Sequence, residues 1–161
     1  MLTARKVIEE LKKCGITHVV WLPDTETRFM YEALAADPQI TLVPICREGE
    51  AMAIAAGLWM GGKKPVVINQ NTGFFESGDS LRGLGLDLHL PQLLLIGYRG
   101  WHRDGPIDDS AALFLEPVLK AWGIYYYLVE HDSDVIKISR AYREAQEMGK
   151  PVAVLIGGEY T

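Results

Sequence analysis

The sequence predicts a three-layer α/β/α fold with a six-stranded, mainly parallel sheet, and three observations lead to this prediction. Short apolar runs alternate with segments of helical periodicity along the chain. Each run is apolar at nearly every position, which is typical of parallel strands that are covered on both faces. The composition, with 48% hydrophobic and 23% charged residues among 161, is that of an ordinary globular protein. We expect residues 1–161 to form a single domain, since no linker or repeat interrupts the pattern.

Six of these apolar runs are predicted as strands. They cover residues 18–22, 40–46, 65–69, 92–98, 124–129 and 151–156. Apolar residues at helical spacing predict a first helix that Thr3 caps and Gly15 ends. Further helices are predicted over residues 27–36, 48–60, 77–88, 111–121 and 134–148. Residues 70–75 are predicted as a polar turn, and residues 99–109 as a long loop.

The most polar segments of the chain lie at the ends of predicted strands. In an open parallel sheet, ligands bind beyond the carboxyl ends of the strands. The segments that follow a predicted strand are residues 23–24, 47–48, 70–73 and 99–102. We therefore expect these four segments to meet at one edge of the sheet and to form the functional site.

Charge and hydropathy exclude several classes of protein. The formal net charge is −5, from 16 Lys and Arg against 21 Asp and Glu, which argues against a nucleic-acid partner. No apolar run approaches the ~20 residues that a membrane span needs, and the first residues predict a helix rather than a signal peptide. Cys14 and Cys46 lack metal-ligand spacing, so we expect buried, reduced thiols and no metal site. We expect a cytoplasmic protein.

Residues 47–57 open a helix directly after a predicted strand. Glu48 begins this helix, alanines follow, and Gly57 lies nine positions after Glu48. An acidic residue in a first turn interacts favourably with the helix dipole, and small residues allow close packing on a sheet. The segment therefore has a purely structural explanation, while its particular spacing leaves a functional one open.

The order of motifs along the chain resembles that of one group of enzymes. Residues 47–57 look like a segment in the pyrimidine-binding domains of thiamine-diphosphate enzymes such as acetolactate synthases and pyruvate decarboxylases. The whole chain is similar to the alpha subunits of sulfopyruvate decarboxylase and to the matching half of phosphonopyruvate decarboxylase. The shared features are Arg47-Glu48 with its alanine-rich helix, Gly-Lys-Lys-Pro at 62–65, Gln-Asn-Thr-Gly at 70–73 and Arg99-Gly100.

The resemblance implies that Glu48 activates the cofactor. Its carboxyl group would hydrogen-bond the aminopyrimidine ring and stabilise the imino tautomer, which takes the proton from the thiazolium carbon. Burial suits this task, because it favours the neutral form of a carboxyl group. The residues implied to lie against the pyrimidine through backbone groups are Gln70, Asn71, Thr72 and Gly73. Phe75 stands where the family often has a second glycine, which is a departure from the pattern.

The segment after the first strand holds candidate substrate residues. The resemblance implies that Asp24 and Thr25 face the substrate, and that Asp24 relays a proton after carbon dioxide leaves. Asp and Thr are also good helix caps, so a structural explanation stays open.

The long loop holds the candidates for binding a second acidic group. Arg99 and Arg103 suit a sulfonate or phosphonate, because a guanidinium fork matches such groups. Ion pairs with Asp104 or Asp108 are the structural alternative. His102 is a candidate general acid, or an ordinary loop histidine.

A motif of the resembling enzymes is missing from this chain. Their diphosphate and Mg²⁺ are held by a second domain with a Gly-Asp-Gly motif, whereas the one Gly-Asp here, Gly78-Asp79, is followed by Ser80. We therefore expect a beta subunit that carries the diphosphate site, a hetero-oligomer of both chains, and decarboxylation of a small anionic 2-oxo acid. An acetolactate-synthase-like carboligase and a non-catalytic α/β scaffolding module are the alternatives.

Overall fold

Six parallel strands form the centre of the molecule. The computed structural model describes residues 1–107 and 109–158. The strands are β1 (His18–Trp21), β2 (Thr41–Pro44), β3 (Pro65–Gln70), β4 (Leu93–Gly97), β5 (Tyr125–Val129) and β6 (Val152–Ile156). They pair in the order β2-β1-β3-β4-β6-β5, and every neighbouring pair is parallel. The prediction of a six-stranded, mainly parallel sheet is confirmed.

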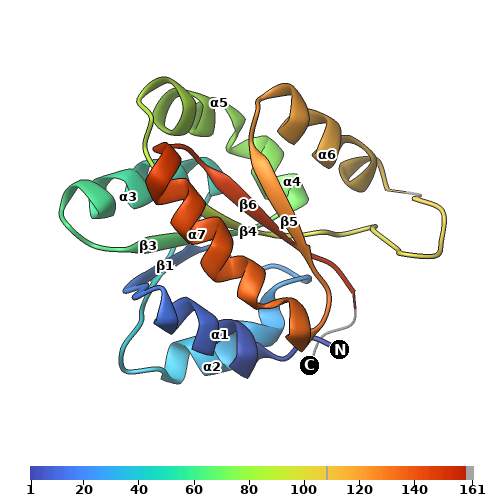
Figure 1. Cartoon of the computed structure of the whole chain (residues 1–161), viewed down its shortest axis with the longest axis horizontal. Coiled ribbons are helices and arrows are strands. Elements are labelled where there is room, and N and C mark those ends of the chain that lie inside the picture. The colour runs from blue at the N-terminus through green and yellow to red at the C-terminus, as the bar shows by residue number, and fades with distance from the viewer. Residues whose placement is uncertain (108, 159–161) are drawn as a thin grey trace.

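Helices cover both faces of this sheet (Figure 1). The helices are α1 (Ala4–Lys13), α2 (Tyr31–Ala36), α3 (Glu48–Met60), α4 (Asn71–Glu76), α5 (Gly78–Ser80), α6 (Ser110–Ala121) and α7 (Ile136–Met148). Short helical turns also occur at η1 (Arg28–Met30), η2 (Leu81–Asp87) and η3 (Asp132–Asp134). None of the helices over the described residues has the length and apolar content that a membrane span requires.

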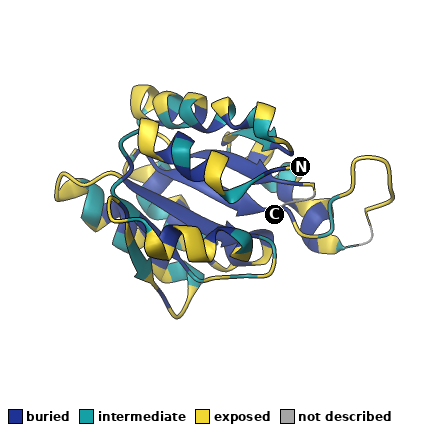
Figure 2. Cartoon of the chain, turned by 90° about the horizontal axis from the view of Figure 1, so that it is seen from below, coloured by how far each residue is buried: buried dark blue, intermediate teal, exposed yellow. Residues whose placement is uncertain are grey.

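The strands alternate their side chains between two apolar cores. In β3, Val66 and Ile68 join the core beneath α1, α2 and α7, whereas Val67 joins the core beneath α3, α4 and α6. Figure 2 shows the buried strands in dark blue between two helical layers whose outer surfaces are exposed. The three-layer prediction is therefore confirmed.

The segment after β3 differs from its prediction as a polar turn. The strand continues to Gln70, and α4 begins at once with Asn71. Phe74 is fully buried in the second core. Burial of this ring stabilises the segment as a helix, although Asn, Thr and Gly are common in turns.

The helix predicted over residues 77–88 is present over residues 78–87, but its geometry changes within it from α to π. A single short turn, α5, leads into the wide π-helical turn η2. Gly85 lies in η2 so close to Pro151 that a methyl group built on it would be 2.4 Å from Pro151 Cγ. The wider turn and the missing side chain together let this segment pack on the start of β6.

The prediction of two buried thiols is wrong. Cys14 is half-buried at the end of α1, and Cys46 is exposed. The reason for Cys46 is that β2 is an edge strand that ends at Pro44, so residue 46 lies in the connection to α3.

Candidate active site

The four polar segments lie at the carboxyl edge of the sheet, as expected. Because β2, β1, β3 and β4 are consecutive neighbours and all parallel, the residues that follow them leave the sheet on the same side. The candidate site is the group of residues 23–28, 47–49, 70–76 and 99–103 at this edge.

Glu48 occupies the first turn of α3. The preceding residue, Arg47, is extended, and the helix begins at Glu48 because the buried Ala51 and Met52 anchor it on the second core. The Glu48 side chain is half-buried. Among the described residues, no hydrogen bond or ion pair engages its carboxyl group. This carboxyl group is therefore available to a ligand at the edge of the sheet.

Gly73 of α4 lies directly against the Glu48 side chain. A methyl group built on Gly73 would be 2.5 Å from Glu48 Cγ and 2.8 Å from Glu48 Oε1. Real side-chain atoms do not approach so closely, so the glycine makes the room that the carboxyl group occupies. The predicted pair of Glu48 and Gly73 is brought together in this way.

Glu76 holds the start of α3 from the same side of α4. Its carboxylate accepts a hydrogen bond from the Gly49 backbone amide and forms an ion pair with Arg47, whose Nη2 lies 2.5 Å from Glu76 Oε1. Ser80 Oγ donates to the Gly49 carbonyl at 2.9 Å. The hydrogen bonds from Arg47 and from the Gly49 amide lower the pKa of Glu76. The amide would otherwise be one of the unsatisfied donors of a helix start.

The polar residues at the start of α4 differ in what they contact. Asn71 is fully buried; its amide donates to the Arg99 carbonyl at 2.9 Å, and its Oδ1 accepts from the Thr72 backbone N–H. Thr72 is exposed, and its hydroxyl donates to Gln70 Oε1 at 2.8 Å. The Asn71 side chain therefore ties the ends of β3 and β4 together, and the exposed Thr72 contacts the buried Gln70.

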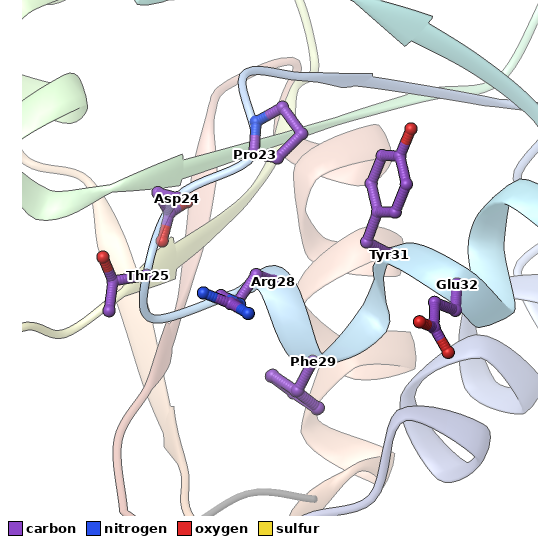
Figure 3. A pocket seen from close by; sticks show the side chains of 7 residues that line it. All are labelled: Pro23, Asp24, Thr25, Arg28, Phe29, Tyr31 and Glu32. Atoms are coloured by element: carbon purple, nitrogen blue, oxygen red, sulfur yellow. The ribbon is translucent and has the colours of Figure 1, made fainter.

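Asp24 is engaged within its own turn. Oδ1 accepts hydrogen bonds from the backbone amides of Glu26 and Thr27, at 2.8 and 2.9 Å, and Oδ2 accepts from the Thr27 hydroxyl. Such contacts are those of a capping aspartate. Thr25, by contrast, is exposed and lines a hollow of about 780 Å³ outside the end of β1 (Figure 3).

The loop between β4 and α6 projects from the body of the molecule (Figure 1). The Arg99 guanidinium lies 3.1 Å from the Asp109 carboxylate, and the Arg103 guanidinium contacts Glu130, a buried carboxylate at the end of β5. Neither of these acids was the partner considered from the sequence, and Asp108 lies outside the described residues. His102 is exposed and lines a second hollow, of about 820 Å³, together with Arg103 and Glu130.

Tyr98 and Trp101 anchor the base of this loop. Their rings stack with centroids 5.8 Å apart and planes inclined by 23°. The Tyr98 hydroxyl donates to Glu116 of α6 at 3.1 Å, and burial followed by the negative charge of Glu116 raises the pKa of Tyr98. The loop therefore leaves a fixed base, although residues 102–107 are exposed.

Two acids of the site were missed by the sequence reasoning. Glu76 lies three residues after Gly73, but this spacing has meaning only if the segment is helical, and a turn was predicted there. Glu130 directly follows a predicted strand, and this position could have marked it as a candidate. Its pairing with Arg103 could not have been predicted, because the two residues are far apart in the sequence.

The arrangement fits one end of a thiamine cofactor. An unengaged, half-buried carboxyl group suits a hydrogen bond to a pyrimidine ring nitrogen, and Gly73 leaves the room in which this carboxyl group lies. The fold and the candidate site thus define an α/β domain whose unengaged polar groups lie at the carboxyl ends of parallel strands. Residues 1–83 match the family described as "Thiamine pyrophosphate enzyme, N-terminal TPP binding domain". The chain belongs to this family, which confirms the resemblance seen in the sequence.

Similar proteins carry names within this family. The chain is 34% identical over 98 residues to the sulfopyruvate decarboxylase subunit alpha of Methanothermobacter thermautotrophicus, a match that covers 61% of this chain and 59% of that protein. It is 26% identical to the same subunit of Methanocaldococcus jannaschii, covering 96% of this chain and 92% of the relative. The phosphonopyruvate decarboxylase of Streptomyces viridochromogenes is 29% identical over 68% of this chain, which corresponds to 27% of that longer protein.

A solved structure shares the fold. The 2-oxoglutarate:ferredoxin oxidoreductase from Magnetococcus marinus, with 2-oxoglutarate, coenzyme A and succinyl-CoA bound, superposes with a TM-score of 0.70. The match covers 96% of this chain and 28% of that chain at 21% identity. At this identity the likeness speaks for the fold alone.

Proposed function

We propose that this chain is the pyrimidine-binding subunit of a thiamine-diphosphate-dependent 2-oxo acid decarboxylase. The observation that carries the proposal is the unengaged Glu48 carboxyl group against Gly73 at the carboxyl edge of the sheet. The names of the relatives support sulfopyruvate or phosphonopyruvate as the kind of substrate. Residues 1–161 then form one pyrimidine-binding domain, and a cytoplasmic location remains a prediction.

Glu48 is assigned to the aminopyrimidine ring. Its carboxyl group would form the hydrogen bond to the ring nitrogen, and Gly73 leaves the room in which the Glu48 side chain lies. Gln70, Asn71 and Thr72 fix the path of the backbone that faces the ring. When bound, thiamine diphosphate supplies the electron sink for the departure of carbon dioxide from a 2-oxo acid.

The substrate contacts are assigned to the neighbouring segments. Thr25 presents an exposed hydroxyl, and His102 presents an exposed imidazole that suits proton donation. Asp24 was a candidate proton relay, but its carboxylate already accepts hydrogen bonds from its own turn, so we assign it to shaping that turn beside the substrate. Arg99 and Arg103 were candidate anion ligands. Each is already ion-paired, Arg99 with Asp109 and Arg103 with Glu130, so a substrate anion would have to bind beside that carboxylate or displace it.

The diphosphate and Mg²⁺ are assigned to a partner. The sequence has no Gly-Asp-Gly motif, and two of the relatives named above are called alpha subunits. A beta subunit that carries the diphosphate site would complete the active site across an interface.

Reconstitution tests this proposal. The chain is mixed with its candidate partner, Mg²⁺ and thiamine diphosphate, and carbon dioxide release is measured from sulfopyruvate, phosphonopyruvate and pyruvate. We expect release only when both chains are present. Release by this chain alone would contradict the shared site, and no release from any of the three acids by the mixture would contradict the decarboxylase assignment.

A further inference from the structure

Four arginines lie at the carboxyl edge of the sheet, and three of them are paired with carboxylates. The pairs are Arg47–Glu76, Arg99–Asp109 and Arg103–Glu130. The fourth arginine, Arg28, begins η1 on the segment that follows β1. Its guanidinium makes no hydrogen bond or ion pair with any residue in the part of the chain that the structure describes. Arg28 is therefore the guanidinium at this edge that is available to an anion.

Arg28 lines the hollow of about 780 Å³ outside the end of β1. Figure 3 shows the guanidinium on the side of the hollow where the turn of Asp24 and Thr25 lies. The one other charged side chain on the opposite side of the hollow is Glu32, whose carboxylate lies beyond Phe29 and Tyr31 in this view. An anion beside Arg28 would thus contact the turn of Thr25 rather than the Glu32 carboxylate.

Two hydroxyl groups line the same hollow. Thr25 and Tyr31 are both exposed, and neither hydroxyl has a hydrogen-bond partner among the described residues. The Tyr31 ring lies against Trp21, with centroids 5.9 Å apart and planes inclined by 52°, which fixes the position of the tyrosine. Figure 3 shows Thr25 on the side toward which the Arg28 guanidinium points, whereas the Tyr31 hydroxyl points away from Arg28. The hollow therefore offers one cationic fork and one neutral donor on the same side, which suits a group with several acceptor oxygens.

Asp24 lines the same hollow, but it is not paired with Arg28. Both of its carboxylate oxygens accept hydrogen bonds from within the turn, including two backbone amides. The Asp24 carboxylate is thus engaged by its own turn and forms no ion pair with Arg28. The Arg28 guanidinium consequently keeps its positive charge facing the open hollow.

We infer that this hollow is the subsite for a sulfonate or phosphonate on the substrate, with Arg28 as the ligand that determines specificity. The inference rests on the proposed function for the identity of the substrate. In this inference Arg28 takes the anion-binding role that the sequence assigned to Arg99 and Arg103. Carboxylates already pair with those two arginines, whereas Arg28 has no ion pair among the described residues. Thr25, predicted as a substrate residue, becomes a donor to the same group.

Binding to the full-length chain tests the subsite without any turnover. Sulfoacetate, phosphonoacetate and acetate are titrated calorimetrically into the wild-type chain and into Arg28→Gln. We expect sulfoacetate and phosphonoacetate to bind more tightly than acetate, and Arg28→Gln to weaken both by about tenfold or more. Arg143→Gln, which alters an exposed arginine on α7, is the matched control and should bind as the wild type does. Equal binding by Arg28→Gln and the wild type, or no preference over acetate, would overturn the inference.

Steady-state kinetics of the two-chain assembly provide a second test of the subsite. Arg28→Gln should raise KM for sulfopyruvate about tenfold or more and leave KM for pyruvate and both kcat values close to those of the wild type. Arg28→Lys keeps the positive charge but loses the forked guanidinium, so its KM for sulfopyruvate should lie between those of the wild type and Arg28→Gln. An equal rise in KM for both substrates would count against the subsite. The assembly could decarboxylate no 2-oxo acid while Arg28→Gln still binds sulfoacetate more weakly than the wild type. That result would contradict the proposed function but support the anion-binding site at Arg28.

Discussion

The side chain of Glu48 fills the space that a side chain at Gly73 would need. A methyl group at Gly73 would lie 2.5 Å from Glu48 Cγ. The two residues belong to helices that follow different strands, so the contact joins the ends of β2 and β3. The position of the candidate cofactor ligand thus depends on a residue that carries no chemistry of its own.

Replacing Gly73 with alanine should displace the Glu48 carboxyl group. We expect Gly73→Ala to lower the stability of the chain by about 1–3 kcal/mol, because overpacking a buried contact costs that much, and to reduce decarboxylation at least tenfold. Thermal unfolding and carbon dioxide release measure the two effects. Gly57→Ala is the control, since a methyl group there meets nothing within 4 Å; it should raise stability by about 0.5–1 kcal/mol. If Gly73→Ala and Gly57→Ala change stability and carbon dioxide release to the same extent, the contact between Gly73 and Glu48 does not explain the effect.

Removing the acidity of Glu48 should abolish most of the activity while leaving the fold intact. We expect Glu48→Gln to lose about 10²-fold or more in carbon dioxide release, the scale of acid–base contributions. Glu50→Gln alters an exposed acid in the same helical turn and should remain close to the wild type. Circular dichroism checks that both variants fold. Wild-type turnover by Glu48→Gln would refute the assignment.

The clamp between Glu76 and the start of α3 should make stability depend on pH. The pKa of Glu76 lies below its ordinary value of 4.5, because Arg47 and the Gly49 amide donate to its carboxylate. Its contribution is therefore fully present above that value and is lost as the pH falls through the folded-state pKa. We expect Glu76→Gln to unfold at lower urea than the wild type at pH 7, and the difference to shrink below about pH 4.

A double-mutant cycle isolates the ion pair within this clamp. If Arg47→Gln costs as much stability in the Glu76→Gln background as it does in the wild type, Arg47 and Glu76 do not interact. A difference that is constant between pH 7 and pH 3 would show that the Glu76 carboxylate is not the group responsible.

Arg103 should contribute to stability through Glu130. Arg103→Gln leaves the buried Glu130 carboxylate without its guanidinium, so we expect a loss of about 1–3 kcal/mol in urea unfolding. Glu130→Gln in the same chain should restore much of that stability, because a neutral amide has no charge to bury. If the double variant also regains the wild-type KM for sulfopyruvate, Arg103 acts on the fold and not on the substrate.

The sequence was sufficient for the parts of the molecule that depend on local pattern. The apolar runs gave the strands, and their parallel arrangement brought Asp24, Glu48 and Arg99 to one edge. The start of α3 at Glu48 also follows from local signals, since an acid and several alanines favour a helix there. These predictions needed no knowledge of which elements pack together.

The parts that could not be predicted depend on contacts between distant residues. Gln70 to Phe75 reads as a turn until the burial of Phe74 against the second core is known. The partners of Arg99 and Arg103 were likewise set by the path of the loop, which places Glu130 beside Arg103 although 27 positions separate them. Glu76 became visible only once α4 was a helix.

The spacing of Gly73 and Glu76 limits how this segment can change. The two residues are three apart on α4, so they lie on one face, which meets the first turn of α3. Each inserted or deleted residue would rotate one of them by about 100° around the helix axis. The room for Glu48 and the clamp on Gly49 would then point in different directions. Substitutions at the exposed Thr72 or Phe75 preserve this geometry, so α4 is constrained in its length more strictly than in its composition.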